Sequence, residues 1–262
     1  MIWGLVALAG TYALAVSRLG RRGIDWPAGR SLAWYAGVAT AAAAGLGNHH
    51  DFRTHMSAHL LLGMAAPILL VLARPMTLLL RTLPVRPARC VARVLRSPAA
   101  SVLPHPVTAA VLDAGGLWLL YTTDLHAQAM ARPWLHTLVQ VHMLLAGCLL
   151  TAAIIGRDPA PHRPGPRTRG LVFLAFIAAH GVLAKYLYGH PPVGVPAADA
   201  EAGAQIMYYG GDLLHLVVIV LFFQRVFVAT AGEPRVHAAR ESDTGVADRP
   251  GERGHDRGRL PG

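Results

Sequence analysis

The sequence has few charged residues and very few cysteines. Only 15% of its 262 residues are charged, whereas soluble domains carry about a quarter. This composition excludes an ordinary water-soluble domain and favours an integral membrane protein. The two cysteines, Cys90 and Cys148, form no CxxC motif, which argues against a disulfide framework and against a thiolate metal site.

The apolar N-terminus has no positive residue before it and several arginines after it. A secretory signal has the reverse order, so we expect a first membrane span instead. Acidic residues are also scarce, with 14 Asp and Glu against 24 Lys and Arg. The basic residues stand in short blocks between apolar runs, as in the cytoplasmic loops of membrane proteins. Membrane lipid is therefore the expected partner, and nucleic acid is not.

Seven apolar segments have about the length needed to cross roughly 30 Å of hydrocarbon as helices. Backbone groups in lipid must pair within the segment, which favours helices. Pro67 interrupts the hydrogen bonding of the third segment and predicts a kink there. The segments are residues 2–18, 32–47, 56–73, 106–122, 135–155, 171–188 and 207–228.

Arginines cluster in loops 19–31, 74–105 and 156–170 and after the last segment, while the alternate loops hold few. The positive-inside rule then places the N-terminus outside and the C-terminus inside. We expect an all-α, polytopic membrane protein, with residues 1–228 forming a seven-helix transmembrane domain. Residues 229–262 are expected to be a basic, disordered cytoplasmic tail.

Four of the fourteen histidines lie in the predicted spans away from the outer helix ends, namely His59, His142, His180 and His215. At a helical rise of about 1.5 Å per residue, all four lie in the outer half of the membrane at broadly similar depth. We therefore expect these imidazoles to face one another rather than lipid. Further histidines lie in the outer loops and at the outer helix ends: His49, His50, His55, His126, His136 and His190.

The spacing of neighbouring polar residues supports a shared face. His55 and His59 are four residues apart, and Asp212 and His215 are three apart, so each pair lies on one side of a helix. An acidic residue within a span normally faces the bundle interior and has a partner. Asp212 is therefore expected to orient His215 or to act as a ligand itself.

Imidazole binds copper, zinc, iron and nickel, and the thioether of methionine favours Cu(I). Histidines with methionines near the outer side, and without cysteine, point first to copper. Several alternatives remain open from these residues alone. They are a haem-binding electron carrier with histidine axial ligands, a copper or proton transporter with a relay of Asp113, Asp212 and His180, and a purely structural role for the histidines.

Four stretches together resemble the bacterial cytochrome c oxidase assembly factors of the CtaG type, the seven-helix group associated with caa-type oxidase. The resemblance covers roughly residues 5–228. The stretches are "HMSAHLLLGMAAPILLVLARP", "HTLVQVHMLLAGCLLTAAIIGRDPAP", "HGVLAKYLYG" and "QIMYYGGDLLHLVVIVLFF".

The resemblance implies a multi-pass protein of the bacterial plasma membrane that assists cytochrome c oxidase subunits and is not itself an enzyme. It also implies a role in copper supply to the oxidase. The positions that match the family's motifs are the expected metal-binding residues: His55, His59, His136, His142, His180, Asp212 and His215.

Overall fold

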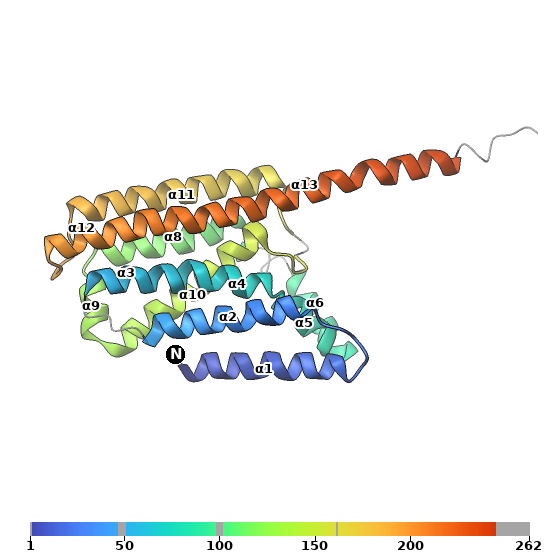
Figure 1. Cartoon of the computed structure of the whole chain (residues 1–262), viewed down its shortest axis with the longest axis horizontal. Coiled ribbons are helices and arrows are strands. Elements are labelled where there is room, and N and C mark those ends of the chain that lie inside the picture. Colours follow the sequence, from blue (N-terminus) through green and yellow to red (C-terminus); the bar gives the residue numbers. More distant parts are fainter. Residues whose placement is uncertain (1, 47–50, 98–101, 161, 245–262) are drawn as a thin grey trace, which may run out of the picture. The chain divides into compact units, whose positions relative to one another are not determined.

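The computed structural model describes residues 2–46, 51–97, 102–160 and 162–244, and within these ranges all regular structure is helical (Figure 1). The chain divides into two units, Met1–Phe222 and Phe223–Gly262, which are considered separately. Two histidines of the expected outer loop, His49 and His50, lie outside the described residues.

Each of the seven predicted segments coincides with helix. Two π-helical segments, η1 (Leu61–Ala65) and η2 (Ile206–Gly210), join α3 to α4 and α12 to α13. The α-helices are α1 (Ile2–Gly20), α2 (Ala28–Leu46), α3 (Phe52–Leu60), α4 (Ala66–Leu72), α5 (Pro75–Thr82), α6 (Val85–Leu95), α8 (Pro106–Thr122), α9 (Leu125–Ala131), α10 (Pro133–Ile155), α11 (Pro166–Gly189), α12 (Ala197–Gln205) and α13 (Gly211–Thr244).

Four helical runs in the described part of the chain are long and apolar enough to cross a membrane: Phe52–Leu72, Pro133–Ile155, Pro166–Gly189 and Ala197–Val228. The full count of seven spans and the orientation stay predictions. The predicted tail from residue 229 also stays a prediction. As described, α13 continues to Thr244, and residues 245–262 lie outside the description.

Prolines set where several of these helices begin. Pro75, Pro106, Pro133 and Pro166 stand at the first positions of α5, α8, α10 and α11. The first backbone N–H groups of a helix have no partner within it, so a residue without an N–H costs nothing there. The ring also fixes φ near the helical value.

The predicted disturbance at Pro67 takes the form of a π-helix. The five residues of η1 directly precede Ala66 and Pro67. Proline has no N–H to donate to the carbonyl four residues before it, which here belongs to Gly63. Helix α10 packs against η1 at this point, and a Cβ added to Gly147 would overlap the Gly63 carbonyl oxygen. Only glycine therefore fits at position 147.

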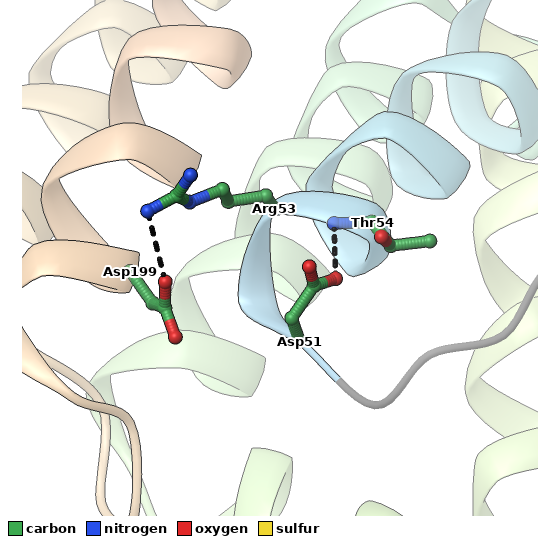
Figure 2. Close-up of polar contacts among 4 residues, drawn as sticks. All are labelled: Asp51, Arg53, Thr54 and Asp199. Atoms are coloured by element: carbon green, nitrogen blue, oxygen red, sulfur yellow. Dashed lines mark hydrogen bonds and ion pairs between the residues drawn. The ribbon is translucent and has the colours of Figure 1, made fainter.

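At the other end of the same helical run, Asp51 caps the start of α3. Its Oδ1 accepts a hydrogen bond from the Thr54 N–H at 2.9 Å (Figure 2). Arg53 pairs across to Asp199 of α12 at 3.2 Å, but its side chain is half exposed, and such ion pairs contribute little. The cap is therefore the stronger determinant of where α3 begins.

We predict that Asp51→Ala lowers the thermal stability of the purified protein and frays the first turn of α3. Asp51→Asn should preserve both, because asparagine caps helices about as well as aspartate. Hydrogen bonds from the Thr54 side chain and backbone lower the pKa of Asp51 below its usual value of 3.8. The contribution of the Asp51 carboxylate to the free energy of unfolding is therefore fully present above pH 3.8. It is lost as the pH falls through the pKa of Asp51 in the folded protein, which is lower. Equal melting temperatures for the alanine and asparagine variants would contradict the cap.

Candidate functional site

Three buried histidines from three helices form a continuous row inside the unit Met1–Phe222. His59 comes from α3, His180 from α11 and His215 from α13, and each is at most 4% exposed. The rings of His59 and His180 have centroids 6.1 Å apart and lie within 20° of parallel. The rings of His180 and His215 are 5.1 Å apart and perpendicular. The expected meeting of these three imidazoles is therefore present.

Aromatic side chains line the row. Phe176 contacts both His180 and His215, at centroid distances of 6.1 and 5.7 Å, and Phe173 contacts His215 at 5.9 Å. Tyr121 of α8 lies edge-on to His59 at 6.5 Å. These rings give the imidazoles largely apolar surroundings and present π-electron faces and edges to them.

Several ring nitrogens in this row have no hydrogen-bond partner within the described structure. They are Nδ1 and Nε2 of both His59 and His215, and Nε2 of His180. A buried polar group without a partner costs about 1–3 kcal/mol, and in natural proteins it usually reflects a water, an ion or a functional role. No described protein group therefore competes for these ring nitrogens.

A second histidine pair lies beside the row, toward the start of α3. His55 of α3 and His126 of α9 have ring centroids 4.8 Å apart. The Nε2 of His55 is hydrogen-bonded to the Tyr121 hydroxyl at 3.0 Å. Burial, and then the nearby His136, lower the pKa of His126 to about 4, so its ring is neutral at physiological pH. Tyr121 thus contacts both His55 and His59 and links the pair to the row.

His136 of α10 faces the same region. It lines a small cavity together with His55, His59 and Met143. The cavity measures about 20 Å³, which is room for a single water molecule. Three of the expected site residues, His55, His59 and His136, therefore line one narrow cavity.

The remaining expected residues lie differently. His142 is exposed on α10, with its Nε2 3.2 Å from the Leu112 carbonyl oxygen of α8, and it does not join the row. Asp212 is half exposed, and its Oδ1 lies 3.9 Å from Nδ1 of His215. That distance allows an electrostatic interaction but exceeds the limit for a hydrogen bond.

Asp113, which the transporter alternative places in a relay with Asp212 and His180, is buried on α8. It lines a second cavity of about 20 Å³ with His215, Thr151 and Gly63. One water molecule at this place could hydrogen-bond both the carboxyl group and the imidazole. This cavity therefore connects His215, at the end of the histidine row, with Asp113 of α8.

The described residues contain no group of three or more His, Cys, Asp or Glu side chains already arranged to hold a metal ion. Met56 and Met207, both fully buried, belong to an apolar cluster around Tyr121 and Leu183. Their thioethers serve packing in this arrangement. Any metal bound at the row would therefore use two imidazoles at a time, or would draw the rings closer.

The profile of the cytochrome c oxidase caa3 assembly factors matches residues 10–228. The chain belongs to this family. The match covers every helix that contributes to the histidine row, and it confirms the resemblance of the four sequence stretches. The family's description names it as a family of cytochrome c oxidase caa3 assembly factors.

Relatives of this family member include uncharacterised mycobacterial proteins. Those of Mycobacterium bovis and Mycobacterium tuberculosis are each 38% identical to it over 192 residues, 68% of this chain and 29% of the relative. One from Mycobacterium leprae is 30% identical over 253 residues, 84% of this chain and 38% of the relative. The chain thus spans about a third of the length of these relatives. No solved structure matches it.

The sequence did not single out Tyr121 or His126 as expected metal-binding residues. The sequence predicts an outer loop at His126, whereas the structure buries this side chain on the short helix α9. The only local signal is its spacing of three from buried Ala129, which gives α9 one buried face. Two residues are too few to reveal such a face from sequence.

Proposed function

We propose that this assembly factor assists cytochrome c oxidase maturation by holding copper in transit along its buried histidines. His59, His180 and His215 would form the inner binding row, and His55 with His136 would receive the ion from the outer side. Asp212 would hold His215 in its binding orientation. His142, which faces α8, would take part only if α10 rotates.

The observation that supports this proposal is the set of partnerless ring nitrogens on His59, His180 and His215. A neutral imidazole offers one lone pair to a metal, and a low-coordinate Cu(I) ion is satisfied by few such donors. Buried imidazoles that lack protein partners are thus available to an ion without first breaking other bonds. A carrier must also release its cargo, which a loosely organised site permits.

The proposal includes a place in the cell. We infer that the chain crosses the bacterial plasma membrane seven times with its N-terminus outside. The histidines then lie in the outer half of the membrane and open toward the side on which His126 and α9 lie. The copper would be passed to an oxidase subunit, and the chain itself would catalyse no reaction.

We predict that the detergent-purified protein retains copper after Cu(I) loading under reducing conditions and dialysis. His180→Ala, which removes the middle ring of the row, should lower retained copper at least about tenfold. His190→Ala is the matched control, because His190 is exposed and stacks on Tyr186 away from the row. The measurement is metal content per chain, with circular dichroism to verify folding.

Oxidase activity in cells that depend on this chain gives the second readout. His180→Ala should reduce it and His190→Ala should not. Equal copper in the wild type and His180→Ala, or none in either after loading, would overturn the assignment of copper to the row.

A second function is favoured by one observation, the cavity shared by Asp113 and His215. With a water in that cavity, Asp113 and the histidine row could move protons between the two halves of the membrane. Proton flux into proteoliposomes that is abolished by Asp113→Asn would support it over copper transit. A haem is less well accommodated, because the two cavities described beside His59 and His215 each have room for about one water.

A further inference from the structure

A much larger cavity lies beside the part of α10 that is remote from His136. It measures about 440 Å³, which is within the range of ligand-binding pockets. Its walls are almost wholly apolar and come from several helices. The residues that define it best are Trp34 of α2, Leu70 of α4, and Leu144, Cys148 and Ala152 of α10. None of the buried histidines described above lines it.

The cavity is polar at one end only. That end is formed by the loop after α10, where Asp158, His162 and Arg163 line it. Along α10 the lining runs from Leu144 to Ala153, and these nine steps correspond to about 14 Å at the helical rise. One leaflet of a bilayer is about 15 Å of hydrocarbon. The cavity therefore has the length of one leaflet and a polar group at one end.

The acidic group at this rim is already engaged. Asp158 accepts hydrogen bonds from the backbone N–H groups of Met76 and Thr77, at 3.1 and 2.8 Å, and so caps the start of α5. Its Oδ1 also accepts a bond from the Thr77 hydroxyl. The carboxylate thus lies at the N-terminus of α5, where the helix dipole carries partial positive charge and favours a negative group.

Positive charge exceeds negative charge around Asp158. Arg163 is partly buried and donates to the backbone carbonyls of Gly156 and Asp158, so neither bond neutralises it. Burial, and then the nearby Arg30 and Arg157, lower the pKa of Arg74. Several guanidinium groups therefore compete for one carboxylate, and an additional anion would be favourable here.

We propose that this cavity binds an anionic phospholipid, with one acyl chain along α10 and the phosphate beside Arg163 and His162. The apolar walls fit a hydrocarbon chain, and the charge at the rim fits a phosphate better than a neutral group. A guanidinium can donate two parallel hydrogen bonds to a phosphate. The proposal shares no residue with the copper row and is independent of it.

The test measures lipid retained by the purified protein in native mass spectrometry, with phosphatidylglycerol and phosphatidylcholine added in turn to a neutral detergent. The wild type should retain phosphatidylglycerol about tenfold more tightly than phosphatidylcholine. Arg163→Gln should remove that preference. Arg89→Gln is the matched control, because Arg89 is an exposed arginine on α6 that does not line the cavity.

Arg163→Gln also removes hydrogen bonds from Arg163 to the backbone of its own loop. A second variant therefore tests the cavity without changing this loop. Ala152→Phe should fill the cavity and reduce retention of both lipids, while Ala175→Phe, on an exposed face of α11, should not. In a variant that retains only Cys148, bound phosphatidylglycerol should slow maleimide labelling of this wall residue. Equal retention of the two lipids by the wild type, or unchanged phosphatidylglycerol retention in Ala152→Phe, would overturn the proposal.

Discussion

Gly147→Ala is expected to destabilise the protein by about 3 kcal/mol or more, the upper range for overpacking a buried contact. The added methyl group would overlap the backbone carbonyl of Gly63 and press on the ring of Pro67. Neither neighbour is the mobile end of a long side chain, so α10 and η1 would have to separate. Thermal unfolding in detergent, together with the yield of folded protein, measures the effect.

Gly115→Ala is the control for this variant. Gly115 is also a helical glycine, on α8, but a Cβ there meets nothing within 4 Å. Replacing a helical glycine by alanine otherwise favours the helix by up to about 1 kcal/mol. If both variants melt at the wild-type temperature, the close approach of α10 to η1 is not as described.

Gly211→Ala is expected to disable the histidine row without removing a histidine. A Cβ at this position would lie 2.6 Å from Cε1 of His180. The His180 ring is fully buried between His59, His215 and Phe176 and has nowhere to retreat. We therefore expect at least about a tenfold loss of retained copper, similar to the loss in His180→Ala.

Gly181→Ala provides the matched comparison, since Gly181 follows His180 directly in α11. A Cβ there would meet Tyr208 at 3.6 Å, an ordinary van der Waals contact. This variant should keep wild-type copper and wild-type melting. Copper retention that is equal in Gly211→Ala and Gly181→Ala would show that the position of the His180 ring does not matter for binding.

The positions of the helices could be predicted from the sequence because long apolar runs between arginine-rich segments leave little choice. The disturbance next to η1 could also be predicted, because Pro67 cannot donate a backbone hydrogen bond. What the sequence could not give was the short helix α9, which has one turn of buried face and no long apolar run. It was consequently read as a loop.

The sequence predicted the depth of the histidines along their helices but not the direction in which each side chain points. His59, His180 and His215 meet as expected, but His142 turns toward α8. Depth along a helix follows from residue counting, whereas direction around the axis depends on the tilt and rotation of each helix. The tilt and rotation of a helix are set by close contacts with its neighbours. One such contact lies between Gly116 and His142, where a Cβ added to Gly116 would be 2.5 Å from Nε2 of His142. A single sequence does not show such contacts.

The two π-helical segments have a consequence for how this protein can vary. One follows His59 and the other precedes His215. Each turn there holds more residues than an α-turn, so the helical stretches before and after each π-helical segment are offset in angle around the helix axis. Loss of a single residue from either segment would restore regular winding and swing the histidine beyond it by about 100° around the axis. The number of residues in η1 and η2 therefore determines whether the imidazoles face one another. Insertions or deletions in these two segments would harm the site more than most substitutions.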